Sequence, residues 1–296
     1  MSLAAPAGST PTTPAAPATR PAHARVSLIQ AILVIWHRDV IRFSRDRTRL
    51  LVSLAQPLLY LLVFGVGLSA SLGSGLGLPP GVTYLQYMCP GVMGMAVLFT
   101  AMFSAMSVVW DREFGFLREI LVAPIKRSAV AVGKALGGAT QAMVQGVLLL
   151  AFAPVVGVKL SLLGVLELVP LLFVLAFALT SLGVALAARM KSMQAFQSVM
   201  TLLVMPMFFL SGALFPLSNL PGWMTVLTWL DPVAYGMAPI RAAVLDGAGV
   251  PAAVLDRFTG ITLGSYTMPA TLDIAVLSAF GAVFLGIAMR ALRRRG

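Results

Sequence analysis

The chain has 296 residues, of which 59% are hydrophobic and only 10% are charged, and its mean hydropathy is +0.93. A soluble domain carries about 25% charged residues, so this composition excludes a water-soluble fold and predicts a protein whose solvent is lipid. The net charge of +11 does not indicate nucleic-acid binding, because the basic residues fall in short clusters between apolar runs and no aromatic residues interleave with them.

The N-terminal arm, residues 1–25, consists largely of Ala, Pro, Ser and Thr. It has too little apolar bulk to offset its ordering entropy, so we expect it to be disordered. Residues 26–49 follow as an amphipathic helix, with a stripe of arginines at helical spacing that includes Arg38, Arg42 and Arg45. Such a helix is expected to lie in the membrane interface. The alternative is that it forms the cytoplasmic end of a long first span.

Six stretches are long and apolar enough to cross about 30 Å of hydrocarbon as helices. They are residues 50–70, 88–109, 130–156, 162–187, 196–215 and 272–289. We therefore predict an all-α polytopic membrane protein with one transmembrane domain over residues 26–296. Of the 21 Lys and Arg residues, only Lys159, Arg241 and Arg257 fall on one side of these spans. The positive-inside rule then places both termini in the cytoplasm, in a bacterial inner membrane.

The predicted spans carry little chemistry. Lys134, Glu167 and Asp273 lie near span ends, where we expect their charges to snorkel to the interface. An ion-coupled carrier is therefore disfavoured, since it needs ionisable groups within the membrane. The sequence has no phosphate-binding loop, no metal-ligand cluster and no nucleophile–base pair. We predict a protein that is not an enzyme and binds no metal or cofactor of its own; a membrane enzyme acting on lipid is disfavoured for the same reasons.

Polar residues in two spans have two interpretations. Gln141 and Gln145 are four residues apart and so share one face of the third predicted span. They form hydrogen bonds between helices, or they line a substrate path. Ser198 and Thr201 on the fifth span have the same two interpretations. Gly133 and Gly137 are also four apart, a spacing that lets helix backbones approach closely.

The connection over residues 217–271 is too apolar for a solvated loop. We expect short helices that re-enter the outer leaflet, since irregular backbone at that depth must be covered by protein. Trp223, Asp231 and Arg241 lie in this segment. A charge there is costly unless paired, so one hypothesis pairs Arg241 with Asp231 or Asp246; the alternative is a solvated arginine.

Two groups of residues are similar to a known family. The first is Asp111, Arg112, Glu113, Gly115, Leu117, Leu121 and Pro124, and the second is Ser211–Gly212, Phe215–Pro216, Trp223, Asp231–Pro232 and Arg241. With them, residues 26–296 resemble the permeases of ABC-2 type exporters, particularly the antibiotic-resistance branch typified by daunorubicin exporters of actinobacteria. That family often has Asn where this chain has Asp231.

The resemblance implies six spans, an N-terminal interfacial helix and re-entrant outer helices between spans five and six. It also implies a transporter of two permeases, identical or paralogous, and two cytosolic ATPases that bind ATP and Mg. The cargo would be a hydrophobic or amphipathic small molecule: a drug, an antibiotic or a lipid. The rival is the branch that exports polysaccharides or lipid-linked glycans; its Tyr-Lys-x-Ser-type stretch before the first span is absent from RFSRDRTRLLVSL.

A permease without a nucleotide site must receive force through a cytoplasmic protrusion. Residues 112–127 are the inner connection with enough length and character for this role. We predict a short coupling helix ended by Pro124, with an apolar edge and a polar rim typical of an interface: Arg112, Glu113, Phe114, Gly115, Leu117, Arg118, Glu119 and Leu121. The alternative is a helix that floats among the lipid headgroups.

Overall fold

The computed structural model describes residues 27–72, 78, 81–114, 126–158, 161–217, 220–246, 260–263 and 266–294. The N-terminal arm lies outside these residues, as does most of the predicted coupling helix, from Gly115 to Pro124.

Long helices make up most of the described chain, in the order α1 (Leu28–Arg45), α2 (Arg47–Leu72), α3 (Tyr84–Ser104), α4 (Met106–Glu113), α6 (Arg127–Leu150), α7 (Leu162–Ala187), α8 (Met193–Leu210), α9 (Gly222–Leu230), α10 (Pro232–Asp246) and α12 (Ala270–Arg294). A 3-10 turn, η1 (Ala153–Val156), follows α6. Two short antiparallel strands, β1 (Thr262–Leu263) and β2 (Tyr266–Thr267), precede α12.

Polar residues mark the starts of three long helices. The hydroxyls of Thr83, Ser161 and Ser192 accept hydrogen bonds from the backbone N–H groups three residues later, at the starts of α3, α7 and α8. At α3 the capping is reciprocal, because Gln86 Oε1 accepts from the Thr83 N–H at 3.0 Å.

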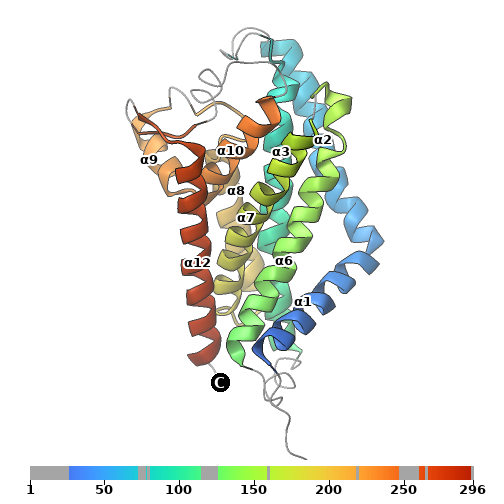
Figure 1. Cartoon of the computed structure of the whole chain (residues 1–296), viewed down its shortest axis with the longest axis vertical. Helices are drawn as coiled ribbons and strands as arrows, with labels where there is room; N and C mark the ends of the chain where they lie inside the picture. Colours follow the sequence, from blue (N-terminus) through green and yellow to red (C-terminus); the bar gives the residue numbers. More distant parts are fainter. Residues whose placement is uncertain are drawn as a thin grey trace, which may run out of the picture.

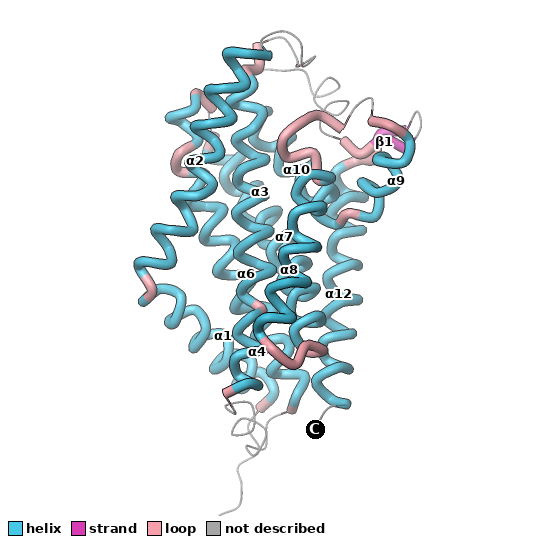
Figure 2. Tube along the Cα trace, turned by 180° about the vertical axis from the view of Figure 1, so that it is seen from behind, coloured by secondary structure: helices cyan, strands magenta, loops and turns pink. Residues whose placement is uncertain are grey.

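The bundle is built around α3, α6 and α7, which pack against one another, with α12 against α7 on one flank (Figure 1). The chain breaks at Asp46, so that α1 crosses the lower end obliquely while α2 rises beside α3. Seen from behind, α8 lies over the middle of the bundle, and α9 and α10 lie at the end opposite the C-terminus (Figure 2). The described C-terminal residues and α1 thus share one end.

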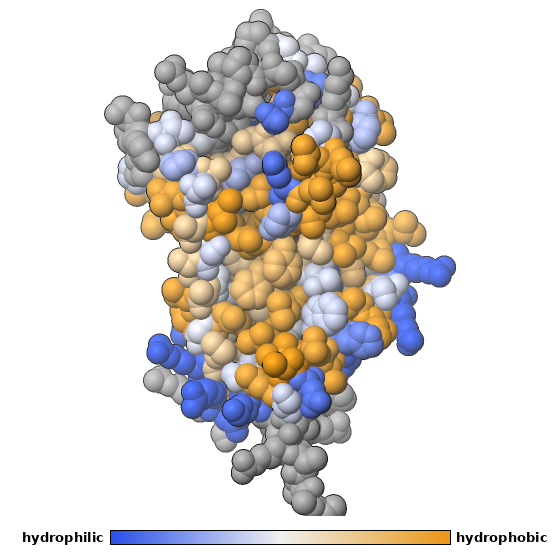
Figure 3. Space-filling view, in the orientation of Figure 1, coloured by the Kyte–Doolittle hydropathy of each residue, from blue (hydrophilic) through white to orange (hydrophobic). Residues whose placement is uncertain are grey.

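Five helical segments of the described chain are long and apolar enough to cross a membrane: Leu50–Gly67, Tyr84–Glu113, Leu162–Ala187, Met193–Leu210 and Ala270–Arg293. The third predicted span, now α6, is not among them, because Lys134, Gln141 and Gln145 lower its hydropathy. Apolar side chains cover the waist of the molecule and hydrophilic ones gather toward its lower end (Figure 3). That distribution suits a protein whose waist faces hydrocarbon.

Several element ends differ from the predicted ones. The amphipathic helix ends at Arg45, four residues before the expected boundary, and α8 ends at Leu210 rather than at residue 215. The second predicted span begins earlier, at Tyr84, and continues through a break at Ala105 into α4. This break brings Trp110 and Asp111 to the lower end of the bundle, where the polar contacts gather.

Candidate functional site

Four charged side chains from three helices meet at the lower end of the bundle. Lys134 of α6 lies between two carboxylates, with its Nζ 3.2 Å from Asp39 Oδ2 of α1 and 2.8 Å from Asp111 Oδ2 of α4. Arg38 Nη2 is 3.3 Å from both Asp39 Oδ1 and Asp111 Oδ2. Lys134, Asp39 and Asp111 are all buried. We call these four residues the ionic cluster.

The ionic cluster has no net charge, since its two cations balance its two carboxylates. Its buried members Lys134 and Asp39 also form hydrogen bonds with uncharged side chains. Lys134 Nζ donates to Ser107 Oγ at 3.1 Å, and Gln141 Nε2 donates to the backbone carbonyl of Asp39 at 3.3 Å. Charges taken out of water are tolerated only when paired and hydrogen-bonded in this way.

Glycines on α6 allow α1 to approach closely enough for these contacts. A Cβ at Gly133 would lie 2.8 Å from Ile35 Cβ, and one at Gly137 would lie 3.0 Å from Asp39 Cβ. Trp36 Nε1 also donates to Thr140 Oγ1 at 3.0 Å, again across the contact between α1 and α6. The predicted interfacial helix is therefore bound to the bundle through its inner face.

The end of α4 is tied to the junction of α7 and α8. Arg112 donates from Nη1 to the Met190 carbonyl at 2.6 Å and from Nη2 to the Ala188 carbonyl at 2.9 Å. Glu113 Oε2 accepts from the Met193 N–H at 3.3 Å, while Phe114 is 75% exposed. These are the described members of the predicted coupling helix, and they join its start to two further helices.

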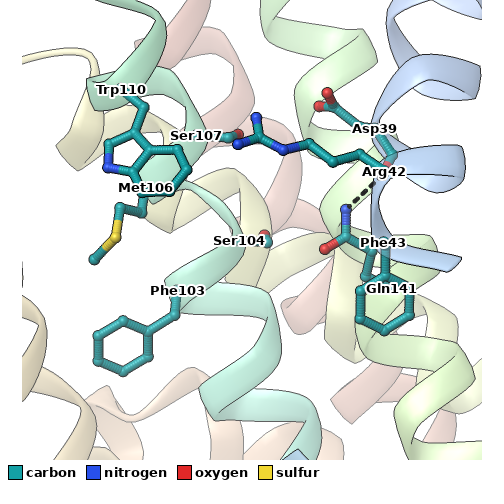
Figure 4. A pocket seen from close by; sticks show the side chains of 9 residues that line it. All are labelled: Asp39, Arg42, Phe43, Phe103, Ser104, Met106, Ser107, Trp110 and Gln141. Carbon is teal, nitrogen blue, oxygen red and sulfur yellow. Dashed lines mark hydrogen bonds between the residues drawn. The ribbon is translucent and has the colours of Figure 1, made fainter. Parts of the chain in front are cut away.

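A cavity of about 160 Å³ lies beside the ionic cluster, between α1 and α4. Figure 4 shows Arg42 reaching across it, with its guanidinium toward Trp110 and Ser107. The guanidinium carbon is 5.1 Å from the centroid of the Trp110 ring, within the range of a cation–π contact. Arg42 and Arg45 of the predicted stripe are both exposed, but only Arg42 lines the cavity.

The structure separates the two pairs of predicted polar span residues. Gln141 and Gln145 are buried inside the bundle, where Gln145 Oε1 accepts from Ser53 Oγ of α2 at 3.1 Å. Ser198 and Thr201 are exposed on α8 beside Gln194 and Gln197. Their hydroxyls donate to the carbonyls of Gln194 and Gln197, each at 3.0 Å. The first pair thus contacts other helices, while the second faces outward.

At the opposite end, Arg241 of α10 is 1% exposed. Its Nη2 donates to the carbonyl of Gly212, and its guanidinium carbon is 4.4 Å from the centroid of the Tyr87 ring. The expected pairing with Asp231 or Asp246 is wrong, since no carboxylate in the described chain lies within 4.0 Å of this guanidinium. Burial lowers the pKa of Arg241.

Asp231 instead caps α10. Its Oδ1 accepts from the Val233 N–H at 3.0 Å, but its Oδ2 is buried without a hydrogen-bond partner. Burial raises the pKa of this carboxyl well above its ordinary value, and the Val233 hydrogen bond opposes the shift. Trp223, the third predicted residue of this segment, is 68% exposed on α9.

The ionic cluster was not predicted from sequence. Lys134 and Asp273 were expected to snorkel to the interface, but both are buried. Asp39 lies 95 positions from Lys134 in the chain, and no local pattern pairs such residues. The sequence feature that could have indicated the ionic cluster was the pair Gly133 and Gly137 on the same helix. This pair predicts that another helix packs closely, but it does not identify that helix as α1.

One family model and three known proteins match this chain. The model of the ABC-2 type transporter family matches residues 30–245. Nodulation protein J of Rhizobium meliloti is 28% identical over 272 residues, which cover 89% of this chain and 93% of the relative. The inner membrane transport permease YadH of Escherichia coli K12 is 28% identical over 232 residues, covering 75% and 85%. Nodulation protein J of Rhizobium leguminosarum bv. viciae is 27% identical over 248 residues, covering 83% and 93%.

Proposed function

Because this chain belongs to the ABC-2 type transporter family, we propose that it is the membrane permease of an ATP-driven exporter. It would lie in the bacterial inner membrane with six spans, which are the five apolar segments described above and α6. Both termini would lie in the cytoplasm. The observation that carries this proposal is the ionic cluster, which joins α1, α4 and α6 immediately before the predicted coupling helix.

Energy would enter from two cytosolic ABC ATPases that bind ATP and Mg. A force on residues 115–125 would reach α4 directly, because these residues follow Glu113 in the chain. From α4 it would pass to α6 through Asp111 and Lys134, and to α7 and α8 through Arg112 and Glu113. Since several helices are engaged at once, the lower end of the bundle would move as a unit.

A second permease, identical or paralogous, would cover α8. Gln194, Gln197, Ser198 and Thr201 are exposed on a helix that is otherwise apolar enough to span a membrane. Polar groups that face acyl chains are costly, so such a strip favours a protein contact or a water-filled path. We place the cargo path between two copies of this face, with α9 and α10 as re-entrant helices near its outer end.

The cargo would be a hydrophobic or amphipathic small molecule. A lipid-linked glycan is the second candidate, and the α8 strip favours it, since amides and hydroxyls suit sugar hydroxyls. The two candidates are separated by measuring ATP-driven uptake into inside-out vesicles, once with a labelled hydrophobic cation and once with a labelled lipid-linked glycan. The compound that accumulates identifies the cargo class.

The test of the proposal is Leu117→Asp, which places a charge on the apolar edge of the predicted coupling helix. We expect the ABC ATPase to be lost on co-purification and ATP-driven transport to be abolished, while membrane insertion is normal. The matched control is Val155→Asp, an equal charge on a side chain that is 83% exposed in η1, at the other end of α6. A Leu117→Asp permease that binds its ATPase and transports at the wild-type rate disproves the coupling assignment.

A further inference from the structure

Two neighbouring cavities make up what we call the slot, and the first is the cavity beside the ionic cluster. A second cavity of about 170 Å³ lies above it, between α2 and α3, and the two share Phe43 and Phe103 as walls. The slot thus places a cavity beside the ionic cluster next to one of similar volume that lies nearer the middle of the bundle.

The lower end of the slot suits an anion. Arg42 makes no ion pair within the described chain, so its guanidinium donors remain available beside Trp110. Ser107 accepts from Lys134, which leaves its own hydroxyl proton free to donate. Asp39 also lines this cavity, but Lys134 and Arg38 compensate its charge. The ionic cluster is neutral, so Arg42 makes the wall net positive.

The upper end suits an acyl chain. Apolar side chains dominate its walls, among them Pro57 of α2 and Met95, Ala96 and Phe99 of α3. Neighbouring side chains of α2 point outward, with Leu51 69% and Leu59 60% exposed. In the orientation of the proposed function, on which this step rests, Trp110 lies at the level of the inner headgroups, where Trp is enriched.

We propose that this slot binds one acidic phospholipid of the inner leaflet. The phosphate would contact Arg42 and Ser107, and one acyl chain would run past Phe43 and Phe103 into the upper cavity. An acidic lipid is preferred to a zwitterionic one because the wall has an excess positive charge. Bound there, the lipid would fill the space between α1 and α4 next to the ionic cluster.

Native mass spectrometry of the full-length permease tests this, in detergent containing equal amounts of phosphatidylglycerol and phosphatidylcholine. We expect the wild type to retain phosphatidylglycerol in about fivefold preference, the factor typical of one basic residue near an anionic lipid. Arg42→Gln loses this preference. The matched control is Arg45→Gln, which removes the same charge from the same helix outside the slot and keeps the preference.

A second variant tests the upper cavity separately. Thr100 of α3 lines this cavity, so Thr100→Phe fills it while leaving Arg42 in place. We expect retention of phosphatidylglycerol to fall about as far as in Arg42→Gln. Inorganic phosphate, added as a competitor, should displace no lipid, because it lacks the acyl chain. The proposal is overturned if Arg42→Gln retains the preference, or if Arg45→Gln loses it equally, which would indicate a diffuse basic surface. Displacement by inorganic phosphate would identify an anion site instead. None of these lipid-binding measurements requires the ATPase. A failure of the proposed transport function would therefore leave their outcome unchanged, and the two proposals can fail independently.

Discussion

At the scale of single residues, Lys134 decides whether the ionic cluster is stable. It contacts both carboxylates and has only 2% of its side chain exposed. We expect Lys134→Met to lower the free energy of unfolding by about 3–5 kcal/mol, the usual cost of leaving buried charges unpaired. Thermal unfolding of the purified permease measures this.

Two further variants isolate the cause. The double variant Asp111→Asn with Lys134→Met should recover part of the loss, because it removes one of the two carboxylates that Arg38 alone would otherwise have to compensate. Lys191→Met, at an exposed lysine between α7 and α8, should leave the unfolding temperature unchanged. Equal effects of Lys134→Met and Lys191→Met would show that the ion pairs contribute nothing.

Asp231 predicts a dependence of stability on pH. Its folded pKa is raised above the ordinary value of 3.8 by burial, so the folded state holds its proton more tightly than the unfolded state. The contribution of Asp231 to the free energy of unfolding is therefore complete at low pH and is lost as the pH rises through its raised folded pKa.

We expect the unfolding temperature to fall as the pH rises from the ordinary pKa of 3.8 toward the raised folded pKa, and Asp231→Asn to reduce this slope, since the amide resembles the protonated carboxyl. Asp246→Asn, at the exposed end of the same helix, is the control and should keep the wild-type slope. An unchanged slope in Asp231→Asn would assign the pH dependence to other groups. The Asn that the resembling family often carries at this position is consistent with a neutral group there.

At the scale of elements, the contact between α1 and α6 is set by glycine. An added methyl group at Gly133 would come within 2.9 Å of Ile35 Cγ2 and 3.1 Å of the Ile32 carbonyl oxygen. We expect Gly133→Ala to destabilise the permease by about 1–3 kcal/mol through overpacking. Thermal unfolding is again the measurement.

The matched control is Gly286→Ala on α12, where nothing lies within 4 Å of the added carbon. Because Ala favours a helix over Gly by about 1 kcal/mol, this variant should be neutral or slightly stabilising. If Gly133→Ala behaves in the same way, then α1 does not depend on this close approach.

Sequence reasoning was more informative about elements than about contacts. Apolar length located the long helices, because a membrane span needs about 20 apolar residues whatever surrounds it. The glycine pair at Gly133 and Gly137 indicated a close helix contact. It did not identify α1 as the partner, because small residues allow any neighbouring helix to pack closely and do not select one. The ionic cluster was missed for a similar reason: pairing between Asp39 and Lys134 is a tertiary contact.

At the scale of the whole molecule, the excess of Lys and Arg at one set of connections still predicts that both termini are cytoplasmic. The described C-terminal residues and α1 lie at one end of the bundle, an arrangement consistent with that orientation (Figure 1). How α9 and α10 fold over the other end could not be derived from composition. Their position depends on contacts such as those of Arg241 with Gly212 and Tyr87, which join segments far apart in the chain.

The polarity of α6 has a consequence for how this protein is made. Five helical segments of the described chain are apolar enough to enter lipid one at a time, whereas α6 carries a lysine, two glutamines and several glycines. Each of those polar groups acquires its partner only from another helix: Lys134 from α1 and α4, Gln141 from α1 and Gln145 from α2. If α6 spans the membrane as we propose, we expect the earlier helices to remain at the exit site until α6 emerges, so that membrane insertion and tertiary folding of this helix coincide.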